Sequence, residues 1–247
     1  MQRLLKIALL LFVSASLLTS CDEKAQVLTP ALSDYMPLEV GKYIRYRCDS
    51  TVFVNFGTKD TVKSYQVKDV VDALITDNSN RPTYRIIRYL NDTAASGTWT
   101  PISTYTVTPT NATIELVENN LRFVKLKLPI ADGVTWGGNN YIQTTSESST
   151  VQYLKGWDYV YDKFEQAFTV WNNLNIPNTV TVNQRDETLG TPTDANFYSE
   201  RNFSKEVFGK GIGLIYKEFL HWEYQPPSSS NHGYTGYGIK LTMIDHN

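Results

Sequence analysis

The segment TIELVENNLRFVKLKL, residues 113–128, has the clearest hairpin pattern in this chain. Two arms rich in β-branched and large apolar residues flank Asn119 and Asn120. Asparagine tolerates the positive φ angles that a two-residue turn between antiparallel strands requires. The segment therefore predicts a β-hairpin and makes antiparallel sheet the starting hypothesis for the fold.

The second arm, 121–128, alternates apolar and polar residues, as in a strand with one buried face. We predict that Lys125 and Lys127 point outward. The apolar positions lose their alternation between Phe123 and Leu126, and such a half-step is typical of a β-bulge, which inserts one extra residue into a strand.

Strand-like segments occur on both sides of the hairpin, separated by turn residues such as Gly, Asn, Asp and Pro. We predict strands over 43–56, 61–76, 83–90, 99–108, 178–185, 214–224 and 237–244, and a further strand pair over 141–145 and 150–154. Asn196–Phe208 fits either a strand or a helical turn. The total is roughly ten strands at close spacing, which predicts antiparallel sheets in a sandwich or barrel.

One segment, Trp157–Trp171, fits two structures. Its large aromatic residues recur at helical spacing, whereas its alternating tyrosines and charged residues suit an exposed strand face. The sequence leaves both alternatives open. We expect at most one or two short helices, and one β-rich domain over residues 35–247, because no Ser/Gly/Pro linker divides this region.

The first twenty residues have the three zones of a secretory signal peptide. Arg3 and Lys6 provide the positive start, 7–18 is mostly apolar, and small residues follow. A helix needs about 20 apolar residues to cross a bilayer, so this run is too short, and no later run reaches that length. We predict that residues 1–20 are removed and that the mature chain has no spanning helix.

The residues Leu18-Thr19-Ser20-Cys21 resemble the lipobox of bacterial lipoproteins. The resemblance implies that the Cys21 thiol receives a diacylglyceryl group, that the chain is cut before it, and that the new amino terminus is acylated, typically with palmitate. Several acyl chains make a stable membrane anchor. We interpret 21–34 as the lipidated cysteine and its tether. The location predicted is the outer membrane, on either its periplasmic face or the cell surface.

The charge balance constrains the partners. The chain has 23 Lys and Arg against 25 Asp and Glu, a formal net charge of −2. Loss of the signal peptide would make it more acidic. This balance argues against a nucleic-acid partner, because a protein that binds nucleic acid requires a basic surface. With Cys21 acylated, Cys48 would be the only free cysteine, and its place in a predicted strand favours a buried, inert thiol.

Three segments resemble a group of Bacteroidota cell-envelope lipoproteins that has no assigned activity: MPLEVGKYIRY (36–46), VFGKGIGLIYKEFLHWEYQP (207–226) and YGIKLTMIDHN (237–247). The turn at Gly211-Ile212-Gly213 is similar to turns in lipoproteins that build a curved, incompletely closed β-barrel. The resemblance implies this architecture and the lipid anchor, and it transfers no catalytic residue.

No catalytic or metal-binding pattern emerges. His221, His232 and His246 lack metal-ligand spacing. Asp158, Asp162 and Glu165 would share one face only if their segment were helical, where paired acids could serve glycoside hydrolysis. We expect no cofactor, no metal site and no enzymatic activity.

Exposed aromatic residues provide the one candidate ligand site. Trp222, Tyr224, Tyr234 and Tyr237 flank the Ser-rich loop 226–233, and exposed rings could stack on sugars or line an apolar groove. The alternative is that these rings only build the core and the sheet faces. We expect a lipid-anchored, non-enzymatic envelope protein that binds a protein, lipid or glycan. A carrier of an apolar ligand is the first alternative, and a glycan hydrolase the second.

Overall fold

The hairpin forms as predicted. Strand β5 (Thr113–Glu118) pairs antiparallel with β6 (Leu121–Lys127). Asn119 and Asn120 between them have φ angles of 52° and 61°, the conformation that a two-residue hairpin turn requires.

The predicted bulge is also present. Glu115 pairs with Val124, whereas the preceding Ile114 pairs with Leu126. One residue of β6, Lys125, therefore has no partner of its own on β5, and a bulge of this kind re-aims a side chain. The prediction that Lys125 points outward is wrong, because its side chain is buried.

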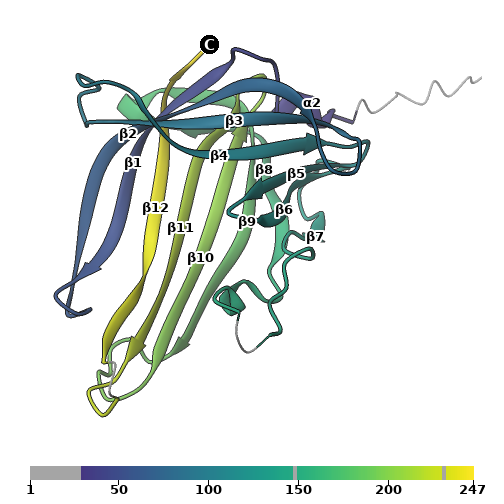
Figure 1. The fold of residues 1–247 in the computed structure, drawn as a ribbon. Helices are drawn as coiled ribbons and strands as arrows, with labels where there is room; N and C mark the ends of the chain where they lie inside the picture. Colours follow the sequence, from purple (N-terminus) through teal and green to yellow (C-terminus); the bar gives the residue numbers. More distant parts are fainter. Residues whose placement is uncertain (1–28, 147–148, 230–231) are drawn as a thin grey trace, which may run out of the picture.

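The computed structural model describes residues 29–146, 149–229 and 232–247. Within them twelve strands form one sheet in which all neighbours pair antiparallel (Figure 1). Besides β5 and β6 these are β1 (Tyr43–Val54), β2 (Lys59–Thr76), β3 (Pro82–Asn91), β4 (Thr100–Pro109), β7 (Thr135–Gly137), β8 (Asp158–Thr169), β9 (Asn175–Gly190), β10 (Ser199–Gly209), β11 (Gly213–Gln225) and β12 (Gly233–His246).

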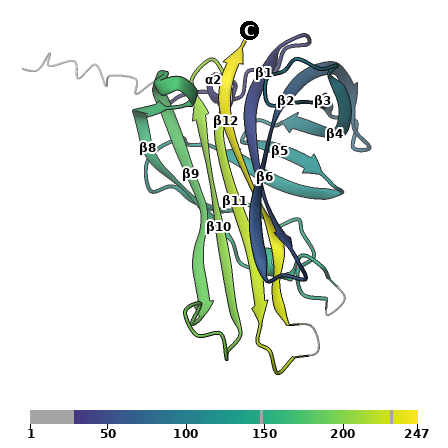
Figure 2. The same ribbon diagram turned by 90° about the vertical axis from the view of Figure 1, so that its left-hand side faces the viewer.

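The strand order is β6-β5-β4-β3-β2-β1-β12-β11-β10-β9-β8-β7. Strands that are consecutive in the chain are neighbours in the sheet, except for β6 and β7. These two strands are the edges of the sheet. The sheet curls until these edges approach each other, so the long strands β8 to β12 form one wall and β4 and β5 run across behind them (Figure 2). This confirms the predicted mainly β fold and its curved, incompletely closed barrel.

The two edges meet along a short seam. The Val124 amide donates to the Gly138 carbonyl at 2.8 Å, and the Trp136 indole donates to the Val124 carbonyl at 2.8 Å. A Cβ atom added to Gly138 would lie 2.3 Å from the Tyr159 ring, so only glycine allows this approach. Beyond the seam, residues 149–157 lie against the interior of the barrel and contribute Tyr153, Leu154 and Trp157 to its lining. We call 149–157 the covering segment.

Helical structure is sparse in the described residues. It comprises α2 (Leu32–Tyr35) and two 3₁₀ turns, η1 (Gln152–Leu154) and η2 (Trp171–Asn173). The side chains of Leu32 and Tyr35 are buried in the core at one end of the barrel. Residues 32–34, interpreted from sequence as tether, therefore belong to the folded domain.

Two other sequence interpretations are resolved by long-range pairing. Residues 158–169 of the ambiguous segment are strand β8, which pairs with β9. Residues 141–145 and 150–154 form no strand pair and instead contain turns and η1. The helical spacing of the aromatic residues was therefore misleading in the first case, and the predicted strand pair is wrong in the second.

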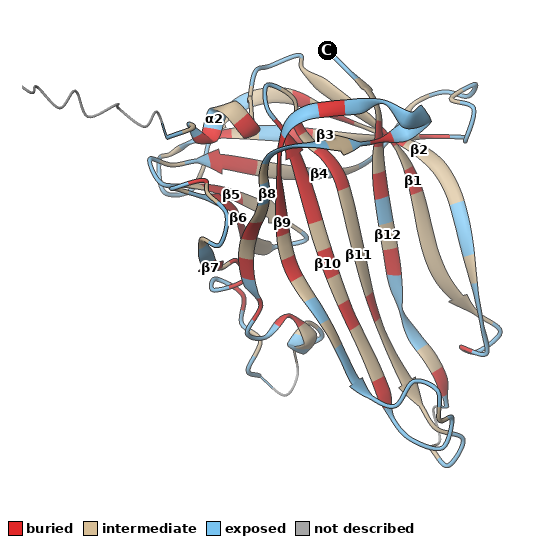
Figure 3. Cartoon of the chain, turned by 180° about the vertical axis from the view of Figure 1, so that it is seen from behind, coloured by how far each residue is buried: buried red, intermediate tan, exposed pale blue. Residues whose placement is uncertain are grey.

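Burial alternates along only part of the strands (Figure 3). Buried and less buried residues alternate over 202–206 of β10 and 241–244 of β12, as expected where one sheet face lines a core. Residues 179–182 of β9 and 206–209 of β10 are buried on both faces. Cys48 is buried on β1, as predicted. Among the described residues, no helix combines the length and the apolar character needed to cross a membrane.

Candidate ligand-binding cavity

The concave face of the sheet lines a cavity of about 290 Å³. The alternate residues Ser204, Glu206 and Phe208 of β10 point into it, and β5, β6 and β12 contribute alternate residues in the same way. Strands β9 and β11 also contribute to the wall. Most of the wall is aliphatic or aromatic, with Leu116, Leu121, Phe123, Phe208, Phe219 and Leu241 among its residues. The interior of the barrel is therefore not completely filled by its own side chains.

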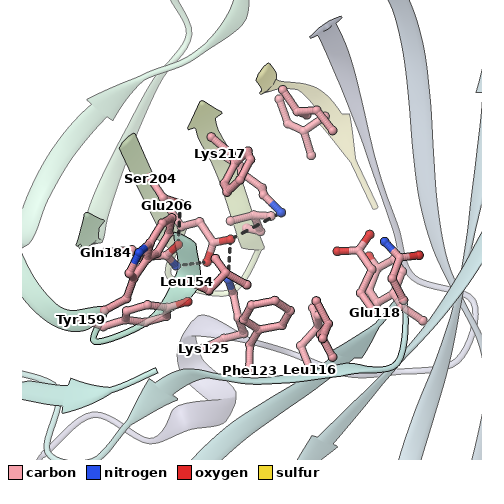
Figure 4. Close-up of a pocket in the computed structure, with 18 of the residues that line it drawn as sticks. Leu116, Glu118, Phe123, Lys125, Leu154, Tyr159, Gln184, Ser204, Glu206 and Lys217 are labelled. Carbon is pink, nitrogen blue, oxygen red and sulfur yellow. Dashed lines mark hydrogen bonds and ion pairs between the residues drawn. The ribbon is translucent and has the colours of Figure 1, made fainter. Parts of the chain in front are cut away.

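A charged pair lies within this apolar wall (Figure 4). The Lys125 ammonium donates to Glu206 Oε1 at 2.6 Å, and Gln184 Nε2 donates to Glu206 Oε2 at 2.9 Å. Lys125 is 7% exposed and Glu206 1%. Ser204 Oγ donates to Gln184 Oε1 at 2.6 Å, which fixes the amide. Both carboxylate oxygens of Glu206 thus have donors, as a buried charge requires.

A second ammonium shares the same carboxylate. Lys217 on β11 places its Nζ atom 3.9 Å from Glu206 Oε1. The pKa of Lys125 is lowered, mainly because its ammonium is buried. The charge of Lys217 adds to this shift, and the charge of Glu206 opposes it. The three groups Lys125, Lys217 and Glu206 comprise two cationic side chains and one anionic one.

The opposite side of the cavity has the reverse balance. Arg88 on β3 donates to both carboxylate oxygens of Asp69 at 2.6 and 2.7 Å, and the Tyr105 hydroxyl donates to the same carboxylate at 2.8 Å. Arg88 is also 4.0 Å from Glu118 Oε1. Burial, and next the charge of Asp69, raise the pKa of Tyr105 well above its usual value. Arg88, Asp69 and Glu118 thus comprise one cationic side chain and two anionic ones.

Aromatic residues of the covering segment line the cavity. The Tyr153 ring stacks on His221 with centroids 3.8 Å apart, and Trp157 lies 6.2 Å from Phe219. His221 Nδ1 donates to Asn202 Oδ1 at 2.8 Å. Burial lowers the pKa of His221. The histidine therefore attaches the covering segment to β11 and β10.

The four aromatic residues that the sequence suggested as a ligand site do not form one group. Tyr234 packs against Trp222 and Tyr224, with ring centroids 5.2 and 4.7 Å away, and stacks on Phe53 at 5.6 Å. Tyr237, three positions along β12, packs instead on Phe219 at 5.1 Å and lines the cavity. Because side chains alternate along a strand, Tyr234 and Tyr237 lie on opposite faces of the sheet.

The charged residues of the cavity were not found from sequence. Lys125 sits at the predicted bulge, and a bulge re-aims a side chain, so the sequence contained a signal for its inward position. Glu206 alternates with Ser204 and Phe208 on one strand face, and a carboxylate on a face that also has a large aromatic residue indicates a buried polar group.

The acids considered for hydrolysis do not share a helical face, because Asp158, Asp162 and Glu165 are on strand β8. Within residues 29–146, 149–229 and 232–247, no group of three or more His, Cys, Asp or Glu is placed to hold a metal ion. Cys21, the predicted lipidation site, and residues 1–20 lie outside the described residues.

No family model matches the chain, and no curated protein matches it. Among solved structures, it is similar to a protein from Bacteroides fragilis that is described as exported and as having a YmcC-like fold. The two chains share 9% identity, and the match covers 84% of this chain and 97% of the other with a TM-score of 0.38. A similarity this weak says nothing about function, which must be inferred from the residues of this chain.

Proposed function

We propose that this protein is a lipid-anchored cell-envelope protein whose barrel binds a small molecule with an apolar body and catalyses no reaction on it. The observation that supports binding is the cavity on the concave face. Its volume of about 290 Å³ is near the lower end of the range for small-molecule sites, roughly 300–1,000 Å³. Its wall has the composition of such sites, mostly aliphatic and aromatic with a few polar groups.

The absence of catalysis is proposed from the state of the carboxylates that line the cavity or bind its lining residues. Glu206 is held by Lys125 and Gln184, and Asp69 by Arg88 and Tyr105. We therefore assign these two carboxylates to structure and charge compensation rather than to proton transfer. Glu118 is the exception, and no second free acid faces it among the described residues that line the cavity.

The anchor is proposed from the residues Leu18–Cys21, which resemble a lipobox. Acylation of Cys21 would hold the domain at the outer membrane through a tether of about ten residues, because the folded domain begins at Leu32. Such a tether is long enough to span roughly 30 Å when extended. The cavity could then receive a ligand at, or close to, the membrane surface.

Native mass spectrometry tests the binding proposal directly. A soluble form that starts at Lys24 is purified without detergent and sprayed under native and then denaturing conditions. A mass increment that disappears on denaturation supports a carried ligand and supplies its mass. A bare protein mass, together with no uptake of either phenylalanine or 3-phenylpropanol added at millimolar concentration, would refute the binding function.

A further inference from the structure

The cavity has two charged poles that face each other, and we propose that its ligand is a zwitterion: one ammonium and one anionic group on an apolar body. This inference rests on the proposed binding function and specifies its ligand class. Lys217 and Glu118 enter the cavity from opposite sides (Figure 4).

The positive pole is the Lys217 ammonium. Its nearest anion, Glu206, is already bonded to Lys125 at 2.6 Å, and Lys217 is 3.9 Å away. One carboxylate therefore compensates two ammonium groups. An anionic ligand group beside Lys217 would supply the missing charge, and charge-assisted hydrogen bonds are the strong ones.

The negative pole is the Glu118 carboxylate. Its nearest cation, Arg88, is bonded to Asp69 through two nitrogen atoms and reaches Glu118 only at 4.0 Å. One guanidinium therefore compensates two carboxylates. An ammonium group of the ligand beside Glu118 would restore the balance on this side.

The two poles do not compensate each other in this structure. Among the described residues no ion pair joins Lys217 to Glu118, although both side chains are only partly exposed, at 24% and 27%. A ligand with a single negative charge would be attracted by Lys217 and repelled by Glu118. A ligand with a single positive charge would be attracted by Glu118 and repelled by Lys217. Only a ligand with both charges satisfies both poles, while its apolar body contacts Phe123 and Phe219.

The test uses four compounds that share a phenyl ring on a short chain and differ in the charged groups they carry: phenylalanine, 3-phenylpropionate, 2-phenylethylamine and 3-phenylpropanol. Binding to the mature lipoprotein in lipid nanodiscs is measured by calorimetry, with empty nanodiscs as the blank. We expect phenylalanine to bind at least about tenfold more tightly than each of the other three, because each hydrogen bond to a charged group contributes that much or more. Hexyl phosphoethanolamine, which carries an anionic phosphate and an ammonium, distinguishes a lipid headgroup from an amino acid as the source.

Two variants should change the preference in opposite directions. Glu118→Gln removes the negative pole, so 3-phenylpropionate should bind as tightly as phenylalanine. Lys217→Met removes the positive pole, so 2-phenylethylamine should become the tightest of the four. Lys240→Met is the matched control, since Lys240 is on the neighbouring strand β12 and does not line the cavity.

The results separate this inference from the function on which it rests. If 3-phenylpropanol binds as tightly as either zwitterion, the cavity binds ligands but its poles do not select them, and the inference is overturned. A preference that both pole variants leave unchanged overturns it too. If a ligand is carried in native mass spectrometry but neither zwitterion binds, the binding function stands and the zwitterion assignment fails.

Discussion

Lys125 Nζ lies 2.6 Å from Glu206 Oε1, and this ion pair joins the edge strand β6 to β10 across the inside of the barrel. The two residues are 81 positions apart in sequence. The pair therefore links the N-terminal half of the sheet to the C-terminal half at a point where no backbone ladder does so.

Removal of one charge should destabilise the fold. Glu206→Gln leaves the Lys125 ammonium buried without a counter-ion, and breaking a buried pair costs about 3–5 kcal/mol. Urea unfolding followed by circular dichroism measures the loss. The double variant Lys125→Met with Glu206→Leu should recover most of it, because both charges are then absent.

The control for this experiment is Asp186→Asn, a carboxylate on the same hairpin whose side chain is 74% exposed. Its effect should stay within about 0.5 kcal/mol. If Glu206→Gln costs no more than this control, Lys125 does not depend on its partner in the folded protein.

The seam between the sheet edges should not tolerate a side chain at Gly138. A Cβ atom there would lie 2.3 Å from the Tyr159 ring. Gly138→Val should therefore cost about 1–3 kcal/mol or more, as overpacked sites do, and should speed hydrogen exchange of the Val124 amide, which donates to Gly138. Thr135→Val, at an exposed position on β7, is the control, and equal exchange rates in the two variants would contradict the role of this seam.

The covering segment should loosen in acid. The pKa of His221 in the folded protein is below its ordinary value of 6.5, first because of burial, although nearby Glu200 opposes the shift. The unfolded chain therefore binds the proton more readily, so stability from this group is present above pH 6.5 and falls as the pH is lowered through the folded pKa. Asn202, Glu223 and Tyr153 are the other groups around the ring.

This loss is measured as the difference in unfolding free energy between the wild type and His221→Gln from pH 7.5 to 5. The variant should lose the part of the pH dependence that comes from the ring, while carboxylates that do not contact the ring affect both proteins equally. Parallel pH profiles for the two proteins would show that His221 does not control the segment.

Tyr234 and Tyr237 should have different roles, because they face opposite sides of β12. Tyr237→Ala removes a ring that lines the cavity and should weaken phenylalanine binding by about threefold to tenfold. Tyr234→Ala disrupts the outer cluster with Trp222, Tyr224 and Phe53 and should lower stability without changing binding. Calorimetry and thermal unfolding of the two variants separate these effects, and the reverse pattern would place the ligand on the outer face.

The anchor is tested by Cys21→Ser. Without the thiol no acyl chain can be attached, so incorporation of labelled palmitate should stop and the protein should leave the membrane fraction. Cys48→Ser is the matched control, since that buried thiol should not be acylated. Palmitate incorporation that persists in the Cys21→Ser variant would exclude this cysteine as the lipidation site.

The sequence by itself determined the features that depend on a few adjacent residues. Asn119 and Asn120 specify a two-residue turn because they tolerate positive φ, and the half-step before Leu126 specifies a bulge. Alternation of apolar and polar residues located most strands, because the two faces of a half-buried strand have different surroundings. The same local patterns predicted a mainly β, antiparallel fold, and the resemblance of three segments to known lipoproteins added its open, curved shape.

Only the tertiary structure decided the features that depend on distant partners. Residues 158–169 are a strand because β9 pairs with them, and 32–35 are helical and buried because the open end of the barrel accepts Leu32 and Tyr35. Lys125 points inward because a bulge re-aims it and Glu206, on β10, compensates its charge. The free energy that settles each of these comes from contacts between residues far apart in sequence, and no local pattern encodes the position of such a partner.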